Sequence, residues 1–159
     1  MSESLIITST DKEGIYKELL PQIESVIKQE TDIIANQANI SAILKEAFKF
    51  LWVGFYRVDK DNDELVLGPF QGPLACTRIK YGKGVCGTAW KEGKVIIVPD
   101  VDKFPCHIAC STASRSEIVL PIIKGKEVAG VLDIDSEKLD NFDSTDEVWL
   151  QKIIGYLFF

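Results

Sequence analysis

The spacing of the apolar residues changes near residue 50 and changes back near residue 144. Before residue 50, apolar residues recur at the interval that places them on one face of an α-helix. From Leu51 onward, short runs of β-branched and aromatic residues are separated by polar or glycine-containing turns, which predicts antiparallel strands. Helices at both ends of such a run pack on one face of the sheet, so the spacing predicts an α+β fold.

The chain has enough residues for one domain, which we predict over residues 1–159. We expect N-terminal helices over about 11–50, the sheet and its loops over about 51–136, and a last helix over about 145–157. Two helix starts fit capping boxes, in which a Ser or Thr and a later acidic residue bond to free backbone donors. These are Thr10-Asp-Lys-Glu13 and Ser144-Thr-Asp-Glu147.

The clearest strand pair is a hairpin of residues 117–123 and 127–135, with its turn at residues 124–126. A three-residue turn places Glu117 opposite Asp133, whereas a two-residue turn breaks that alignment, and the sequence leaves both open. Other strands are expected at 51–58, 65–70 and 95–98, a short helix at 85–91, and loops at 71–84 and 99–115.

Acidic residues of this hairpin form a candidate site. Asp133 and Asp135 are two apart and share one face of their strand, and the three-residue turn adds Glu117 to the same patch. Crowded carboxylates raise one another's pKa, which makes a proton donor available near neutrality. The alternative interpretation is that these residues are strand ends that emerge into water.

The charge balance excludes some classes of partner. Acidic residues outnumber basic ones by 24 to 18, which argues against binding of nucleic acid, because that needs clustered Lys and Arg. The longest apolar runs, 118–123 and 95–98, fall far short of the roughly 20 residues of a membrane span. Met1-Ser-Glu-Ser shows no secretory signal pattern. We therefore expect a cytoplasmic protein that binds neither nucleic acid nor membrane.

The cysteines are Cys76, Cys86, Cys106 and Cys110, and most lie in glycine-rich or irregular segments. Thiols in loops are more often accessible and reactive than those inside strands or helices. Redox or nucleophilic chemistry is therefore the favoured interpretation, with zinc binding and inert cysteines as alternatives. Zinc is disfavoured because there is no C-x-x-C pair and the spacing matches no common zinc site. We expect neither a metal nor a cofactor.

Two aromatic residues and the single histidine are further candidates. Trp52 and Tyr56 would share one face of the first strand, where core packing explains them without any ligand. His107 lies three residues before Cys110 and could lower the pKa of that thiol. A solvated loop residue is the simpler interpretation of His107.

The segments that carry these candidates are Trp52-Val-Gly-Phe-Tyr56, Leu67-Gly-Pro-Phe-Gln-Gly-Pro-Leu-Ala-Cys76, Gly82-Lys-Gly-Val-Cys86-Gly-Thr, His107-Ile-Ala-Cys110, Ser116-Glu-Ile-Val-Leu-Pro121 and Val131-Leu-Asp-Ile-Asp-Ser136. Together, over about residues 40–157, they resemble the family of free methionine-(R)-sulfoxide reductases. The resemblance implies a GAF fold, which is a mostly antiparallel sheet with helices on one side, and a homodimer.

The resemblance also implies a thiol mechanism. Cys110 would be the nucleophile, Cys76 the main resolving cysteine and Cys86 an auxiliary one. The thiolate attacks the sulfoxide sulfur, methionine leaves, and the resulting sulfenic acid condenses with a second cysteine to a disulfide that thioredoxin reduces. Cys106 has no counterpart in the family pattern, so the shared mechanism does not require it.

The remaining candidates would bind the substrate. An acid at the sulfoxide oxygen makes the sulfur electrophilic, and other carboxylates would bind the ammonium group of a free amino acid. The resemblance implies that Glu117, Asp133 and Asp135 bind the polar end of the substrate, and that Trp52 and Tyr56 line the pocket for its methyl-sulfur end. Asp100 is a weaker match to a further pocket carboxylate of the family. A rival interpretation is a GAF module that senses a small ligand, suggested by Phe142-Asp-Ser-Thr-Asp146-Glu147, whose simpler role is helix capping.

Overall fold

The protein, described by a computed structural model over residues 4–108 and 110–157, is built on one antiparallel sheet. Its strand order is β3-β2-β1-β6-β5-β4. The strands are β1 (Trp52–Asp59), β2 (Glu64–Gln71), β3 (Arg78–Lys80), β4 (Ile96–Val98), β5 (Ser116–Lys124) and β6 (Glu127–Ser136). The helices are α1 (Lys12–Ile27), α2 (Ile33–Phe48), α3 (Gly84–Glu92) and α4 (Ser144–Ile154), with a 3-10 turn, η1 (Val101–Lys103).

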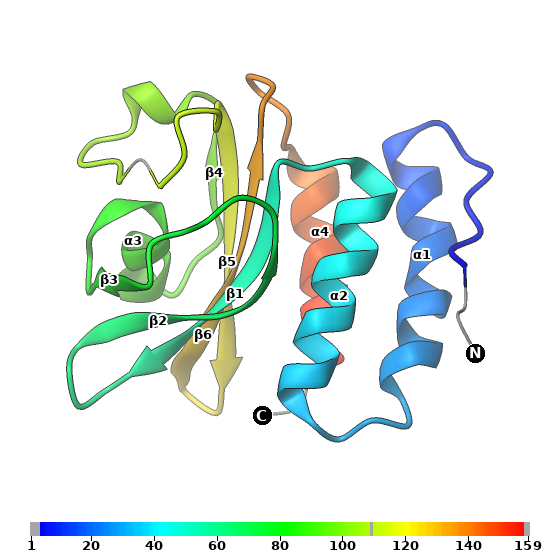
Figure 1. Cartoon of the computed structure of the whole chain (residues 1–159), viewed down its shortest axis with the longest axis horizontal. Helices are drawn as coiled ribbons and strands as arrows, with labels where there is room; N and C mark the ends of the chain where they lie inside the picture. The colour runs from blue at the N-terminus through cyan, green and yellow to red at the C-terminus, as the bar shows by residue number, and fades with distance from the viewer. Residues whose placement is uncertain (1–3, 109, 158–159) are drawn as a thin grey trace.

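The helices cover the two faces of the sheet unequally (Figure 1). On one face, α2 packs against β1 and β2, and α4 packs against β5. Helix α1 lies outside this layer and packs on α2 and α4. Helix α3 and the long loops lie on the opposite face. The predicted α+β fold, with the terminal helices together on one face, is confirmed.

Alternation along the strands divides the apolar residues into two clusters. In β1, Val53 and Phe55 point into the main core beneath α2 and α4. Trp52 and Tyr56 point to the other face and join a second cluster with Val85 of α3. The prediction that Trp52 and Tyr56 share a face is therefore confirmed, and that face is the one that α3 and the long loops cover.

The helix caps lie one residue away from the predicted positions. The N-cap of α1 is Asp11 rather than Thr10, and its side chain accepts a hydrogen bond from the Gly14 amide. The box at α4 pairs Asp143 with Asp146 instead of starting at Ser144. Both predictions are wrong for one reason, since Asp caps a helix at least as well as Ser or Thr and stands next to them here.

Helix α4 is also fixed to α1 through its capping residue. Asp146 is fully buried, and it accepts hydrogen bonds from the Tyr16 hydroxyl and from Lys12 Nζ. Asp146, which the rival interpretation placed in a ligand-sensing motif, therefore already has its hydrogen-bond partners within the fold.

The β5–β6 hairpin differs from its predicted register. Its turn has two residues, Gly125-Lys126, and β6 then carries one extra residue, Ala129, in a β-bulge. Glu117 consequently pairs with Asp135 and not with Asp133, as the three-residue turn had predicted. A two-residue turn alone would put Glu117 on the opposite face of the sheet from Asp133 and Asp135. The extra residue in the bulge reverses that exchange, so all three carboxyl groups still share one side of the sheet.

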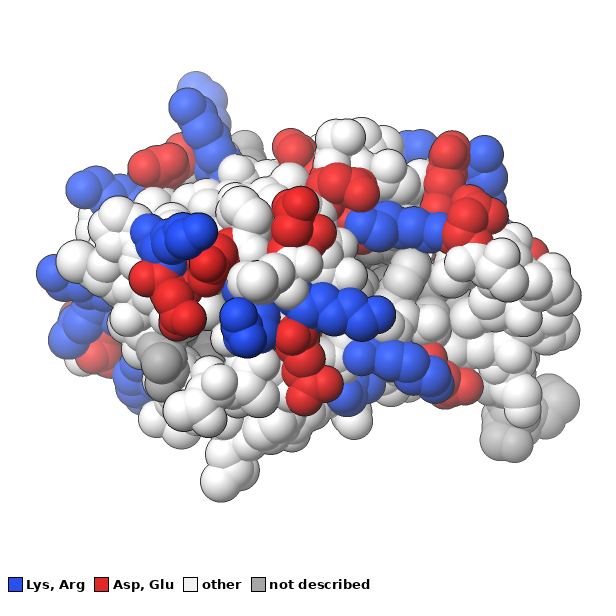
Figure 2. All heavy atoms as spheres, turned by 90° about the horizontal axis from the view of Figure 1, so that it is seen from above, with Lys and Arg blue, Asp and Glu red and all other residues white. Residues whose placement is uncertain are grey.

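Surface charge is mixed. Figure 2 shows acidic and basic side chains interspersed over the face that it displays, without a continuous basic area on that face. No helix within residues 4–108 and 110–157 is long and apolar enough to cross a membrane.

Candidate active site

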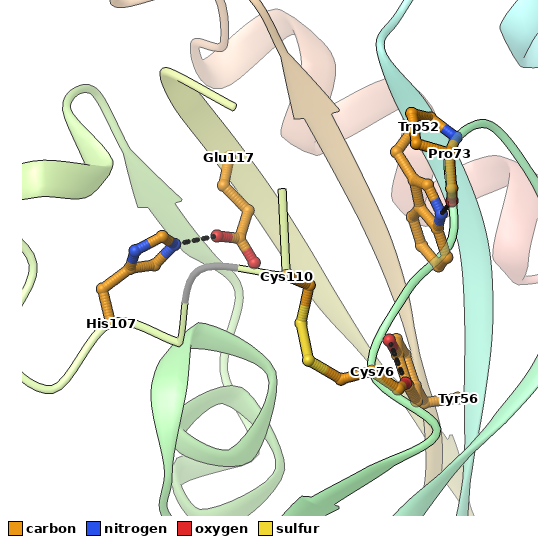
Figure 3. Close-up of a disulfide and its surroundings, with 7 residues drawn as sticks. All are labelled: Trp52, Tyr56, Pro73, Cys76, His107, Cys110 and Glu117. Carbon is orange, nitrogen blue, oxygen red and sulfur yellow. Dashed lines mark hydrogen bonds and ion pairs between the residues drawn. A yellow bond between two sulfur atoms is a disulfide. The ribbon is translucent and has the colours of Figure 1, made fainter. Parts of the chain in front are cut away.

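Cys76 and Cys110 form a disulfide bridge on the α3 side of the sheet (Figure 3). Their Cα atoms are 5.6 Å apart, although the residues are separated by 34 positions in the sequence. Cys76 lies in the irregular segment after β2, and Cys110 lies in the segment between η1 and β5. The fold thus brings together the cysteines to which the resemblance gives the nucleophilic and resolving roles.

A small cavity lies beside the bridge. Its volume is about 40 Å³, which holds at most a few water molecules. Most of the predicted site residues line it. They are Trp52, Tyr56, Cys86, Cys110, Glu117, Asp133 and Asp135, together with His107.

The carboxyl groups in this cavity are deeply buried. Glu117 is 5% exposed and Asp133 is 6% exposed. Burial, together with the charge of Asp135, raises the pKa of both groups well above their usual range. Burial also raises the pKa of Asp135 to about 6, against a hydrogen bond that the Ser114 hydroxyl donates to it. Protonated carboxyl groups are therefore available near neutral pH.

Asp133 and Cys86 meet inside the cavity. The Oδ1 atom of Asp133 is buried without a hydrogen-bond partner among the described residues. The Cys86 sulfur lies within 4.8 Å of ligand oxygens from both Glu117 and Asp133. Burial raises the pKa of Cys86 well above its usual range, and the charges of Asp133 and Glu117 add to the effect. Cys86 is therefore a neutral thiol at physiological pH.

Helix α3 holds Cys86 against the sheet. The helix approaches β3 so closely that a Cβ atom on Gly87 would lie 2.6 Å from the Lys80 carbonyl oxygen. A glycine directly after Cys86 is what permits this approach. A thiol near a helix N-terminus ordinarily has a lowered pKa, and here burial and the neighbouring carboxyl groups outweigh that effect.

Trp52 and Tyr56 hold the segment that carries Cys76. The Trp52 indole donates a hydrogen bond to the Pro73 carbonyl, and the Tyr56 hydroxyl donates one to the Cys76 carbonyl, as Figure 3 shows. The Trp52 ring lies over Gly54, where a Cβ atom would come within 2.4 Å of the ring. The aromatic pair thus does more than core packing, because it positions the loop of the proposed resolving cysteine.

His107 points into the cavity from the loop before Cys110. Its Nε2 atom lies 3.7 Å from Glu117 Oε2, and its side chain is 15% exposed (Figure 3). The interpretation of His107 as a solvated loop residue is therefore wrong. Its three-residue spacing from Cys110 was the only signal in the sequence, and that spacing pointed to the thiol and not to the carboxyl group.

Asp100 and Cys106 lie apart from this group. Asp100 accepts a hydrogen bond from the Asp102 amide and caps η1, and its other oxygen is 3.5 Å from Lys103 Nζ. It lines a surface depression other than the cavity beside the bridge. The role of Asp100 as a further pocket carboxylate stays a prediction. Cys106 is an exposed free thiol with a positive φ of 58°.

The carboxyl cluster, Glu117, Asp133 and Asp135, has little positive charge around it. Within residues 4–108 and 110–157, the one close contact between a basic side chain and a member of this cluster is that of His107 with Glu117. Buried carboxyl groups without Lys or Arg partners are costly in free energy. The cavity is therefore built to receive a cation, to donate a proton, or both.

Comparisons with known proteins agree with this geometry. Residues 35–157 match the family described as GAF domain. The chain is 59% identical to GAF domain-containing protein A of Dictyostelium discoideum over 99% of each chain. It is 43% identical to the free methionine-R-sulfoxide reductase of Escherichia coli, covering 92% of this chain and 88% of that protein. The X-ray structure of free methionine-R-sulfoxide reductase from Neisseria meningitidis, in complex with its substrate, superposes with a TM-score of 0.95 at 56% identity, covering 97% of this chain and 92% of that one.

Proposed function

This chain belongs to the GAF domain family, with free methionine-R-sulfoxide reductases among its relatives, and we propose that it reduces free L-methionine-(R)-sulfoxide to L-methionine. One observation carries the proposal. A bridged pair of cysteines, Cys76 and Cys110, stands beside a buried carboxyl cluster that has no Lys or Arg partner among the described residues.

The thiol chemistry follows from the bridge. In the reduced protein, the Cys110 thiolate attacks the sulfoxide sulfur, and the sulfoxide oxygen leaves with the cysteine as a sulfenic acid. Methionine sulfoxide is reduced to methionine by two electrons, and Cys110 is oxidised by the same two. The Cys76 thiol then displaces water from the sulfenic acid, which gives the bridge seen in the structure. Thioredoxin reduces that bridge by thiol–disulfide exchange.

The carboxyl cluster supplies the acid and the recognition. A sulfoxide becomes electrophilic when a proton donor bonds to its oxygen, and the raised pKa values of Glu117 and Asp133 keep such a donor available. A carboxylate that ionises, as Asp135 does above a pH of about 6, attracts the ammonium group. A methionine within a protein chain has no free ammonium group, so this arrangement favours the free amino acid.

Cys86 has a different setting from Cys76. The resemblance makes it an auxiliary resolving cysteine, and that role stays a prediction. Disulfide exchange requires a thiolate, and the burial of Cys86 disfavours its thiolate form. We therefore assign the recycling to Cys76, whose loop Trp52 and Tyr56 hold in place.

The cycle requires a reducing compartment, because an oxidising one would keep the pair bridged. The expected cytoplasmic location and the thioredoxin partner are therefore parts of the same proposal. The homodimer implied by the resemblance stays a prediction.

A thioredoxin-coupled NADPH oxidation assay on separated sulfoxide epimers tests the function. We expect turnover of free L-methionine-(R)-sulfoxide and little or none of the S epimer or of a peptide-bound sulfoxide. The Cys110→Ser variant is the negative control. Equal turnover of both epimers would reject the assignment, and tight binding of a small ligand without turnover would favour the sensing module instead.

A further inference from the structure

One cluster inside the cavity combines donors of different chemical kinds. The Cys86 sulfur, a Glu117 oxygen and an Asp133 oxygen all lie within 4.8 Å of one another, and all three side chains are buried. His107 adds an imidazole whose Nε2 atom is 3.7 Å from Glu117 Oε2. A thiol, two carboxyl groups and an imidazole thus converge from α3, β5, β6 and the loop before Cys110.

The cluster also has an unused acceptor. Asp133 is 6% exposed, and its buried Oδ1 atom has no hydrogen-bond partner among the described residues. A buried acceptor that makes no hydrogen bond costs free energy. A cation placed between Asp133, Glu117 and Cys86 would satisfy this oxygen directly.

We propose that this cluster binds one zinc ion in the reduced protein, with Cys86, Asp133 and Glu117 as ligands and His107 as the fourth. The ion occupies the place of the polar end of the substrate and so inhibits the enzyme reversibly. The inhibition rests on the proposed function, whereas the binding does not.

The donor set selects zinc among the common divalent ions. Zinc is borderline soft and takes sulfur, imidazole nitrogen and carboxylate oxygen in four-coordinate sites. Magnesium and calcium prefer sites made of oxygen ligands alone. Zinc bonds of about 2.0 to 2.3 Å bring neighbouring ligand atoms to roughly 3.5 Å, so small rotations of Cys86, Glu117 and Asp133 close this group around an ion. His107 lies outside the group of three and reaches the ion by a larger rotation from its place beside Glu117.

Zinc also replaces the protons that these groups hold. A bound divalent ion favours the ionised forms of thiol and carboxyl ligands and displaces their protons to solvent. This role differs from ammonium recognition, because an ammonium group gains nothing from the sulfur of Cys86.

The test removes the other thiols that zinc could bind. A Cys76→Ser/Cys110→Ser background leaves Cys86 and Cys106 as its cysteines and is titrated with zinc sulfate by calorimetry. Cobalt(II) is the spectroscopic probe, because a thiolate ligand gives it a charge-transfer band. We expect one equivalent of zinc and a thiolate–cobalt band.

Single changes in this background identify the ligands. Cys86→Ser should abolish the cobalt band and weaken zinc binding at least tenfold, and Asp133→Asn should weaken it similarly. The matched control is Cys106→Ser, which removes the exposed thiol and should leave both readouts unchanged. Circular dichroism verifies that each variant is folded.

Activity provides a separate readout. In the wild-type enzyme, zinc should raise the apparent KM for free methionine sulfoxide, and a chelator should reverse the effect. Binding without any reductase activity would reject the proposed function and keep the zinc site. Absence of zinc binding, or a cobalt band that survives Cys86→Ser and disappears with Cys106→Ser, would overturn the zinc site and leave the proposed function standing.

Discussion

Glu117 and Asp135 are direct partners across the β5–β6 ladder, and Asp133, which pairs with Val119, lies on the same face two residues along β6. Directly opposed residues in an antiparallel pair have Cβ atoms about 4.5 to 5.5 Å apart. The backbone pairing therefore places the Glu117 and Asp135 side chains next to each other on two paired strands of the sheet. Their raised pKa values are a consequence of strand register and of burial beneath α3 and the loops that line the cavity.

The first prediction concerns the two roles of these carboxyl groups, proton donation and binding of the ammonium group. Glu117→Gln, which removes a proton donor, and Asp135→Asn, which removes a carboxylate for the ammonium group, should each lower kcat/KM for free methionine-(R)-sulfoxide by about a hundredfold, the scale for the loss of an acid catalyst. Steady-state kinetics in the coupled assay measure the effect. The matched control is Glu127→Gln, since Glu127 is exposed on the same hairpin and pairs with Lys60. Near-normal kinetics in both cavity variants would return these residues to a structural role.

The second prediction separates the bridged cysteines. Cys110→Ser should abolish even a single turnover, because no other thiol then attacks the substrate. Cys76→Ser should release one methionine per site and then fail to recycle efficiently with thioredoxin. Rapid-quench measurement of methionine, without and with thioredoxin, distinguishes the two. A methionine burst from Cys110→Ser would show that the roles are assigned to the wrong residues.

The third prediction concerns Cys106, which is exposed and has a φ of 58°. Glycine adopts positive φ without steric cost, so Cys106→Gly should fold as well as the wild type and keep near-normal turnover with thioredoxin. Peptide mass spectrometry of the oxidised wild type should show mainly the Cys76–Cys110 bridge. A dominant Cys106–Cys110 bridge, combined with slow turnover of Cys106→Gly, would make Cys106 the working resolver.

The fourth prediction concerns stability against pH. Burial raises the pKa of Asp135 from 3.8 to about 6, so the folded protein binds this proton more tightly than the unfolded chain does. Protonation of Asp135 contributes to the free energy of unfolding. This contribution is fully present below a pH of about 4 and is lost as the pH rises through about 6. The loss is of the order of 3 kcal/mol, since each pKa unit corresponds to about 1.4 kcal/mol.

Asp135→Asn removes this penalty, because an amide does not ionise. The variant should melt several degrees above the wild type at pH 7.5, and the difference should shrink towards pH 4.5. Differential scanning calorimetry of both proteins in the oxidised state measures it, with Glu127→Gln as the control for a lost surface charge. An equal difference at both pH values would show that ionisation of Asp135 is not its cause.

The strands illustrate what sequence patterns predict and what they miss. Alternation along 133–135 placed the two aspartates on one face correctly, because strand alternation has a fixed period of two. The turn length was left open, since Lys124-Gly125-Lys126 suits a turn of two or three residues, and the structure has the two-residue turn. The bulge at Ala129 has no sequence signal of its own, and it moved the partner of Glu117 from Asp133 to Asp135.

The loops were less predictable than the strands. The short strand β3 falls inside the predicted loop 71–84, because its three residues give too little alternation to detect. His107 approaches Glu117 only because the irregular segment before Cys110 folds back over the sheet. The approach of Cys76 to Cys110 could be anticipated from family resemblance alone, since spacing along the chain does not determine how two loops meet.

The bridge between Cys76 and Cys110 changes the connectivity of the chain during each proposed turnover. In its oxidised form, the protein contains a covalent ring that includes β3, α3, β4 and η1, and the reduced form is an open chain. Closing a ring across 34 positions lowers the entropy of the unfolded state by an amount worth about 4 kcal/mol. An enzyme molecule that waits for its reductant is therefore harder to unfold than one that is ready to react. Scarcity of the reductant would therefore shift the population of molecules towards the form that resists unfolding better.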